Sequence, residues 1–357
     1  MRLTISASPA RAYIAGMSRT VETPYAIRFA RAGGPDVLEA EPLELGAPGP
    51  GEVRVKHVAV GLNFIDTYFR TGLYPVPLPS GLGSEAAGVV ETVGEGVADF
   101  VAGDRVAYSG GAPGAYATDR NVDAGRLVKL PAAIGFEDAA AAMLKGCTAE
   151  YLIERCARVQ AGQAVLVHAA AGGVGSILVQ WLKAIGATVV AHSGSAEKAA
   201  QAKALGADHS LSCAMEELAG EVRAITGGAG VAAVLDGVGA ASWQASLGAV
   251  ARRGIIASYG NASGPVPPID PLELMRAGSI FVTRPTLADY CSSPEEIRAS
   301  AARLFAMMES GAVKVSIGQR FPLRDAAEAH RALEGGTVPA RDLTLVATLG
   351  GLAAAGR

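Results

Sequence analysis

Residues 165–175 read Val165-Leu166-Val167-His168-Ala169-Ala170-Ala171-Gly172-Gly173-Val174-Gly175, and this stretch decides the fold of the chain. Its first residues form an apolar run typical of a buried parallel strand, and residues 176–185 have the apolar spacing of a helix. A strand, a glycine turn and a helix N-terminus together attract a pyrophosphate, through exposed N–H groups and the helix dipole. Ala170, Gly172 and Gly175 stand at the three positions of the G-x-G-x-x-G dinucleotide-binding fingerprint, with alanine in the first.

Strands and helices alternate after this stretch, which indicates a doubly wound parallel sheet. The expected strands are residues 188–192, 232–236, 254–259 and a short piece after Asp208, and the expected helices are residues 196–205 and a segment ending at Thr226. An ordinary glycine-rich turn is the alternative explanation of the motif. The alternation makes a dinucleotide-binding domain the stronger interpretation.

The end of the second strand favours NADPH over NADH. NAD-binding domains place an Asp or Glu about twenty residues after the glycine turn, where it binds the ribose 2′-hydroxyl. This chain has Ser193, Gly194, Ser195 and, one turn later, Lys198 in that region. Hydroxyls and an ammonium group hold a 2′-phosphate, whereas a carboxylate repels it. Two alternatives stay open, because Glu197 is a competing acid that also suits a helix start, and Lys198 is equally explained as a solvated helix lysine.

Short strands joined by Gly and Pro turns precede this domain and predict a small β-barrel. They are expected at residues 26–29, 37–41, 52–60, 86–94, 104–108 and 127–131, before a helix from Phe136 to Leu144. The chain after the dinucleotide domain has expected strands at 279–283, 313–317 and 343–348, and expected helices at 299–308 and 326–333. This last part is too short for a separate large domain and is expected to complete the barrel.

Composition excludes several classes of protein. The 357 residues are 50% hydrophobic and 18% charged, which is typical of a compact globular chain. A net charge of −3 provides no basic surface for nucleic acid, and no apolar run reaches the ~18 residues of a membrane span. The four separate cysteines indicate reduced thiols in a cytoplasmic protein. Residues 1–23 are expected to be a loose extension, with a transit peptide as the alternative.

Several stretches resemble the medium-chain dehydrogenase/reductase superfamily. They are Gly61-Leu62-Asn63-Phe64-Ile65-Asp66, Gly81-Leu82-Gly83-Ser84-Glu85-Ala86-Ala87-Gly88-Val89-Val90, Val93-Gly94 before Gly103-Asp104-Arg105-Val106, and the glycine turn itself. Within it, Asn63, Thr71-Gly72-Leu73-Tyr74-Pro75, Leu144-Lys145-Gly146 and Thr283-Arg284-Pro285 resemble the quinone oxidoreductase branch, which is related to zeta-crystallin. The resemblance extends from about Tyr25 to Thr348.

The resemblance implies an α/β chain with a GroES-like β-barrel catalytic domain, a Rossmann doubly wound parallel sheet domain, and a cleft between them. The implied boundaries are an extension at 1–23, the first part of the catalytic domain at 24–147, the NADP-binding domain at 148–284, and a return to the catalytic domain at 285–357. It also implies a homodimer. The apolar strand expected at residues 279–283 is suited to pairing with its own copy at the sheet edge, unless the chain's own tail covers it.

A catalytic zinc ion is not expected. Zinc-containing members of the superfamily carry a cysteine in the loop that here reads Gly61-Leu62-Asn63, and a histidine where Ser84 stands. Catalytic zinc needs about three protein ligands. Cys147 lies near the place of the third ligand but has no partners, so a buried thiol is the better explanation.

The resemblance implies catalytic roles for Asn63 and Tyr74, which lie near the nicotinamide in similar enzymes, and Lys145 is a third candidate. The alternatives are a turn-forming asparagine and a half-buried barrel tyrosine. The residues expected to contact the cofactor are Asn63, Thr148, Ala171, Gly172, Gly173, Val174, Gly175, Ser193, Gly194, Ser195, Lys198, Cys213, Val238, Tyr259, Gly260, Asn261, Thr283 and Arg284. The chain departs from the similar enzymes at two of the expected cofactor positions. Cys213 stands where they often have Tyr or His near the adenine ribose, and a basic residue is missing near Gly335-Gly336-Thr337, where Arg341 is the possible substitute.

Hydride transfer from NADPH to a quinone needs a positioned nicotinamide and donors for the developing oxyanion, but no metal. The chain is therefore expected to be an NADPH-dependent quinone oxidoreductase. An NADPH-dependent enone or alkenal reductase is the first alternative, because its chemistry is nearly the same. A non-catalytic, crystallin-like NADPH-binding protein is the second.

Overall fold

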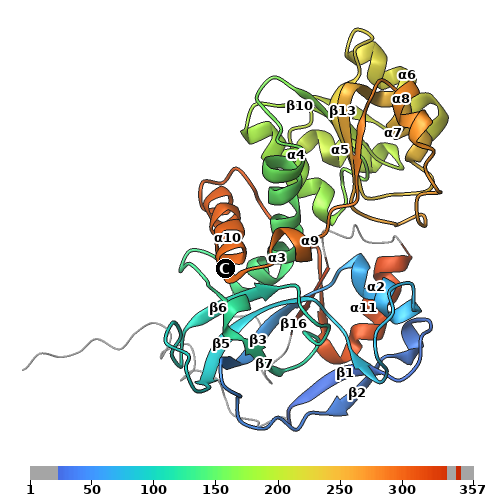
Figure 1. Ribbon diagram of the computed structural model, residues 1–357. Coiled ribbons are helices and arrows are strands. Elements are labelled where there is room, and N and C mark those ends of the chain that lie inside the picture. The colour runs from blue at the N-terminus through green and yellow to red at the C-terminus, as the bar shows by residue number, and fades with distance from the viewer. Residues whose placement is uncertain (1–22, 336–342, 347–357) are drawn as a thin grey trace, which may run out of the picture.

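The computed structural model describes residues 23–335 and 343–346, which form two stacked halves (Figure 1). The upper half contains a parallel sheet and the lower half contains mostly antiparallel strands. The expected extension at 1–23 lies outside the described residues except for its last one. No helix within the described part has the length and apolar character needed to cross a membrane.

The upper half is the expected Rossmann domain. Its sheet has six strands in the order β11-β10-β9-β12-β13-β14, and all neighbours are parallel. The strands are β9 (Ala164–Val167), β10 (Thr188–His192), β11 (His209–Leu211), β12 (Val231–Asp236), β13 (Val250–Ser258) and β14 (Phe281–Thr283). Val165 and Val167 belong to one buried apolar cluster and Leu166 to another, so both faces of the sheet are covered.

Helices connect these strands on the two faces. They are α4 (Gly173–Ala184), α5 (Ala196–Ala204), α6 (Met215–Ile225), α7 (Trp243–Ala249) and α8 (Pro271–Arg276). The expected start of α4 at Ser176 is wrong, because the helix begins three residues earlier, at Gly173. A Cβ at Gly175 would collide with the Ala169 carbonyl oxygen. The bare glycine backbone therefore lets the first helical turn close against the end of β9.

The lower half is built around β3, which pairs with β5, β7 and β16. The larger sheet has the order β15-β16-β3-β5-β6-β8 with β7 beside β3, and a smaller one has the order β2-β1-β4. The strands are β1 (Tyr25–Phe29), β2 (Glu39–Pro42), β3 (Glu52–Gly61), β4 (Ser80–Gly81), β5 (Glu85–Val93), β6 (Arg105–Ser109), β7 (Asp119–Asp123), β8 (Val128–Lys129), β15 (Gln319–Pro322) and β16 (Leu343–Val346). The final strand expected at 343–348 is thus present, with its last two residues outside the described part.

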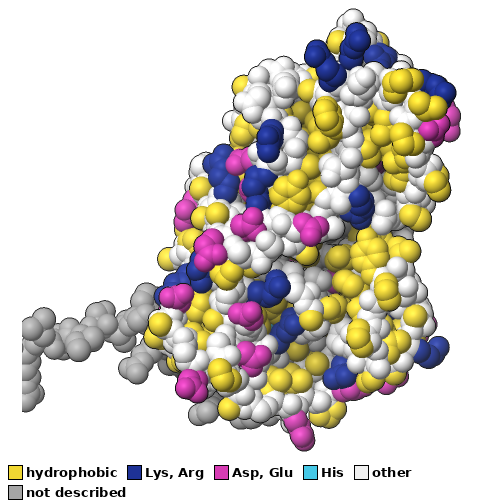
Figure 2. All heavy atoms as spheres, viewed as in Figure 1, with side chains coloured by type: hydrophobic (Ala, Val, Ile, Leu, Met, Phe, Trp, Pro, Cys, Tyr) yellow, Lys and Arg dark blue, Asp and Glu magenta, His cyan; other side chains and the backbone are white. Residues whose placement is uncertain are grey.

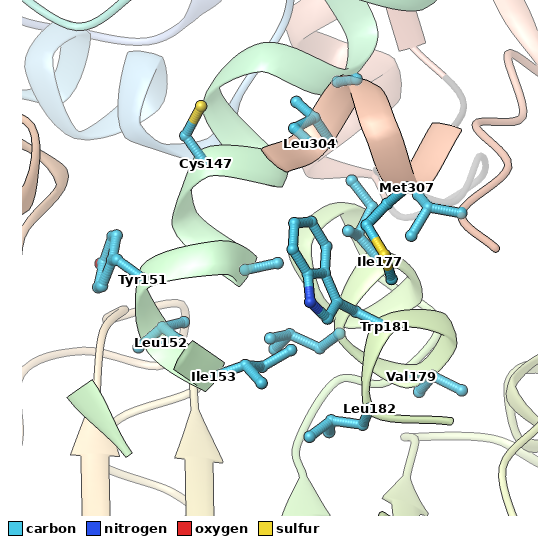
Figure 3. Packing of buried hydrophobic residues seen from close by; sticks show 14 of the residues in the cluster. Cys147, Tyr151, Leu152, Ile153, Ile177, Val179, Trp181, Leu182, Leu304 and Met307 are labelled. Carbon is cyan, nitrogen blue, oxygen red and sulfur yellow. The ribbon is translucent and has the colours of Figure 1, made fainter. Parts of the chain in front are cut away.

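The remaining helices cover the barrel and join the halves. They are η1 (Pro35–Val37), α2 (Phe64–Thr71), η2 (Ala124–Arg126), α3 (Phe136–Glu150), η3 (Tyr151–Cys156), α9 (Leu287–Tyr290), α10 (Pro294–Glu309), η4 (Leu323–Asp325) and α11 (Ala326–Glu334). Figure 3 shows Trp181 of α4 at the centre of their packing, with Leu304 and Met307 of α10 on one side and Ile153 of η3 on another. The Trp181 indole also donates a hydrogen bond to Glu154, at 2.9 Å.

The strand expected at residues 313–317 is wrong. These residues have no regular structure, although Val313 is buried and Val315 packs against the core. The side-chain amide of Gln180 accepts from the Lys314 N–H at 2.9 Å and donates to the Lys314 carbonyl at 3.1 Å. One side chain thus satisfies the backbone groups that a neighbouring strand would otherwise pair.

A chain of buried polar side chains ties α2 to α11. Arg70 donates a hydrogen bond to His330 Nδ1 at 2.7 Å. Because arginine cannot accept a hydrogen bond, the His330 proton lies on Nε2, which is 3.2 Å from Tyr116 Oη. The Tyr116 hydroxyl donates to Asp66 at 3.0 Å. Burial raises the pKa of Asp66 to about 7, and burial together with the Arg70 charge lowers the pKa of His330 to about 3.

Asp66→Asn should change how stability depends on pH. Because the folded pKa of Asp66 lies above its ordinary 3.8, the folded state holds a proton that the unfolded chain releases. Asp66 therefore lowers the free energy of unfolding as pH rises from about 4 to about 7, by on the order of 1.4 kcal/mol per pH unit at most. Urea unfolding at several pH values should show that Asp66→Asn lacks this contribution, so that its free energy of unfolding becomes more favourable relative to the wild type as pH rises from about 4 to about 7.

His57, His168 and His330 have lowered pKa values and act in the opposite direction, but they are present in both proteins and cancel in the difference. Glu39→Gln on the exposed strand β2 is the matched control and should leave the slope unchanged. Parallel pH curves for wild type and Asp66→Asn would contradict the raised pKa.

Candidate active site

The carboxyl ends of the parallel strands bring together most of the residues predicted to bind the cofactor. The glycine turn follows β9, Ser193 to Lys198 follow β10, Cys213 follows β11, Val238 follows β12, Tyr259 to Asn261 follow β13, and Thr283 and Arg284 lie at the end of β14. In a doubly wound sheet, ligands bind at this edge, where the strand order reverses. The reversal lies between β9 and β12, beside the glycine turn.

The start of α4 presents backbone donors to this edge. Gly172 is the N-cap residue and offers no side chain to the N–H groups of the first turn, which contains Gly173, Val174 and Gly175. These N–H groups and the dipole of the twelve-residue helix suit a phosphate group. The arrangement fits the pyrophosphate of a dinucleotide, as the sequence predicts.

The end of β10 offers polar groups for an adenosine ribose. The Ser193 hydroxyl is buried and has no hydrogen-bond partner among the described residues. Ser195 is the N-cap of α5, and its oxygen accepts from the Lys198 N–H at 3.2 Å. The Cys213 carbonyl contacts His192 Nε2 at 3.1 Å, which places Cys213 beside the same strand end. The predicted 2′-phosphate residues therefore lie together, while Arg341 lies outside the described residues.

Asp236 organises the loop after β12 and was missed in the sequence. Its fully buried carboxylate accepts hydrogen bonds from the Val238 N–H at 2.8 Å and from the hydroxyls of Ser242 and Ser246. His168 Nε2 lies 3.0 Å from the Ser246 hydroxyl. The sequence pattern that could have predicted this network is an aspartate at a strand end followed by Gly-Val-Gly. On the neighbouring strand β13, the Ser258 hydroxyl is buried without a partner in the described part of the chain.

Tyr74 connects the two halves. Its hydroxyl oxygen accepts from Asn261 Nδ2 at 3.2 Å and from Arg284 Nη2 at 3.1 Å. Both partners belong to the Rossmann half, whereas Tyr74 follows α2 in the barrel half. The ring packs edge-on against Tyr68 and Phe69. With both oxygen lone pairs occupied, the Tyr74 O–H proton is free to be donated to a ligand.

Asn63 and Lys145 meet at one carboxylate, that of Glu85. Asn63 Nδ2 donates to Glu85 Oε1 at 2.7 Å, and Lys145 Nζ donates to the same oxygen at 3.0 Å. All three side chains are buried. Thr148 lies one turn after Lys145 on α3 and is also buried. The structure thus brings two of the predicted catalytic residues together. Glu85 joins them, at a position where the sequence predicts a structural or cleft carboxylate.

The residues do not form a zinc site. In the part of the chain that the structure describes, no group of three or more His, Cys, Asp or Glu side chains is placed to hold a metal. Ser84 donates to Asp66 at 3.3 Å, and Asn63 is held by Glu85. Burial raises the pKa of the Cys147 thiol to about 12, so it keeps its proton at neutral pH. That the protein works without metal stays a prediction.

Comparisons with known proteins agree with this architecture. The alcohol dehydrogenase GroES-like domain family matches residues 49–154, and the zinc-binding dehydrogenase family matches residues 173–306. A quinone oxidoreductase of Pseudomonas aeruginosa is 48% identical over 308 residues, covering 86% of this chain and 95% of the relative. A 2-haloacrylate reductase of a Burkholderia species is 43% identical over 313 residues, covering 85% of this chain and 94% of the relative.

A solved structure is similar over nearly its whole length. The crystal structure of Escherichia coli quinone oxidoreductase complexed with NADPH aligns with a TM-score of 0.87 at 43% identity, covering 90% of this chain and 99% of that one. The barrel, the six-stranded parallel sheet and these relatives lead to one assignment. The chain belongs to the medium-chain dehydrogenase/reductase superfamily, in its quinone oxidoreductase branch.

Proposed function

We propose that this protein is an NADPH-dependent quinone oxidoreductase that works without metal. The observation that carries the proposal is the polar edge of the Rossmann sheet. There the N-terminus of α4 has no capping side chain, and the buried hydroxyls of Ser193 and Ser258 have no hydrogen-bond partner among the described residues. The similarity to a quinone oxidoreductase solved with NADPH supports the same cofactor here. Bound NADPH would supply a hydride from its nicotinamide ring.

The chain's own residues would bind the cofactor, orient the substrate and stabilise the charge that develops on it. The α4 N-terminus would hold the pyrophosphate, and Ser193, Ser195 and Lys198 would hold the 2′-phosphate. Asn63, Tyr74 and Lys145 would donate hydrogen bonds to the substrate oxygen that gains negative charge during reduction. None of these roles needs a Lewis acid.

Reduction of an activated alkene is the second candidate. It is favoured by the 2-haloacrylate reductase that is 43% identical to this chain. An enone or haloacrylate also develops an oxyanion when a hydride adds to its alkene, so the same three donors would serve. A panel of quinones and enones, each with NADPH, would rank the two substrate classes. Tight NADPH binding without any turnover would instead support a non-catalytic role.

We further infer that the domain boundaries are 24–147, 148–284 and 285–357, and that the protein is cytoplasmic, which its four free cysteines support. A homodimer would form through β14. This strand ends the parallel sheet in the described part, and Phe281 on it is 63% exposed. Leu272 and Met275 of α8 are also exposed. Figure 2 shows hydrophobic side chains gathered over this end of the upper half, as a self-association surface requires.

NADPH should bind at least about tenfold more tightly than NADH, because Ser195 and Lys198 replace the usual acid. Lys198→Ala should reduce this preference and leave NADH binding nearly unchanged. Titration of cofactor fluorescence measures both dissociation constants. Lys203→Ala, on the same helix α5, is the control and should keep the preference. Equal affinities of the wild type for the two cofactors would refute the assignment.

Tyr74→Phe removes one hydroxyl and keeps the ring. If the hydroxyl donates to the developing charge, kcat on the preferred substrate of the panel should fall about tenfold or more, with Tm nearly unchanged. If the ring only stacks on the cofactor, Phe should be tolerated and Tyr74→Ala should raise the KM for NADPH. Unaltered turnover and cofactor affinity in both variants, or unfolding of both, would exclude a role for Tyr74.

Phe281→Glu should convert a dimer into a monomer, because a charge on the edge strand opposes strand pairing across the two-fold axis. Sedimentation velocity at micromolar concentration measures the state. Val101→Glu is the control, since Val101 is similarly exposed, at 62%, in the barrel half. A monomeric wild type at this concentration would overturn the dimer.

A further inference from the structure

Glu85 is a buried carboxylate surrounded by donors. It is the first residue of β5, and its side chain is fully shielded from solvent. One oxygen accepts from Asn63 Nδ2 at 2.7 Å and Lys145 Nζ at 3.0 Å, and the other accepts from the Leu144 N–H at 2.6 Å. Space for it exists because position 61 is glycine, where a Cβ would collide with Glu85 Oε1 and with the Ala140 carbonyl oxygen.

We propose that Glu85 is a positioning residue that aims the Asn63 amide and the Lys145 ammonium at the substrate oxygen. This inference rests on the proposed function. An ionised carboxylate only accepts hydrogen bonds, so the Asn63 amide must turn its nitrogen toward Glu85. That orientation leaves the second Asn63 N–H to be donated to a ligand.

The same carboxylate keeps a positive charge inside the protein. Lys145 is 4% exposed, and a buried ammonium is tolerated when a carboxylate pairs with it. The Asn63 and Lys145 nitrogens both contact one Glu85 oxygen, so they are neighbours, and each has hydrogens left to donate. Together they form a pair of donors whose position is set from behind by Glu85.

Glutamine cannot replace this carboxylate. It has one acceptor oxygen, so its amide nitrogen would face either the Leu144 N–H or the Asn63 and Lys145 donors. Glu85→Gln should therefore misdirect the donor pair and leave the Lys145 charge unpaired. Since removing a donor to an oxyanion lowers kcat by orders of magnitude, we expect kcat to fall roughly 10–100-fold. The dissociation constant for NADPH should stay within about threefold, because the Glu85 side chain is fully shielded from solvent and is therefore out of reach of a bound nucleotide.

The test measures kcat, the substrate KM and the NADPH dissociation constant for Glu85→Gln in two backgrounds. In the wild-type background, Glu85→Gln should lower kcat roughly 10–100-fold. In the Asn63→Ala/Lys145→Met background, adding Glu85→Gln should change kcat less than about twofold, because Glu85 acts only through those two side chains. Glu91→Gln, an exposed position on the same strand, is the matched control and should behave as wild type.

If Glu85→Gln alone fails to fold, the double variant Glu85→Gln/Lys145→Met replaces it, because this variant removes both buried charges. Its kcat should be lower than that of Lys145→Met, since glutamine at position 85 still misorients Asn63. An equal fall in kcat in the Asn63→Ala/Lys145→Met background, or unchanged kcat in the wild-type background, would overturn the positioning role. If the wild type reduces neither quinones nor enones, the proposed function fails first and the inference falls with it. If the wild type does turn over substrate, but Glu85→Gln lowers kcat by the same factor in both backgrounds, only the positioning role is refuted and the proposed function stands.

Discussion

Parallel pairing of β9 with β10 on one side and β12 on the other is the constraint on which the nucleotide site depends. Each strand of a parallel sheet ends at the same edge, so the loops that follow them converge, although their residues are far apart in the chain. Gly172, in the turn that follows β9, and Thr283, at the end of β14, thus lie along one edge. The helix at the glycine turn adds unpaired N–H groups at this edge, and the neighbouring strand ends add hydroxyls.

The barrel half depends on a different kind of interaction, the hydrogen bonding of buried carboxyl groups. Asp66 accepts from the Asn63 backbone N–H at 2.9 Å, while Glu85 accepts from the Asn63 side chain. One residue is thus held at its main chain and at its amide by two carboxylates that water does not reach. Such carboxylates are tolerated because donors surround them. A rigid, preorganised donor is what reduction of a carbonyl-containing substrate requires.

The two halves meet through polar contacts at Tyr74 and through apolar packing around Trp181. The phenol oxygen receives donors from Asn261 and Arg284, so its geometry depends on both halves at once. Trp181 packs α4 of the Rossmann half against α10 and η3, which fixes how the helices that leave the barrel lie against the parallel sheet (Figure 3). The candidate site is therefore shared between the halves.

Local patterns predicted much of the fold. The strand at residues 188–192 matches β10 because an apolar run beside a glycine turn has few other solutions. The same reasoning failed at residues 313–317, where Val313 and Val315 are apolar and alternate as in a strand. There the side chain of Gln180, on a helix distant in sequence, forms hydrogen bonds with the Lys314 N–H and carbonyl in place of a neighbouring strand. It also placed the start of α4 too late, because the close approach of Gly175 to Ala169 is a tertiary contact.

The sequence by itself predicted the alternation of strands and helices in the Rossmann half, the glycine turn after β9 and the serines at the end of the second strand, because these depend on neighbouring residues. Only the tertiary structure decided that Asn63 and Lys145 share Glu85, and that Tyr74 meets Asn261 and Arg284. These partners are separated by many residues along the chain. Their meeting depends on how whole sheets and helices pack, and local propensity carries no information about such distant contacts.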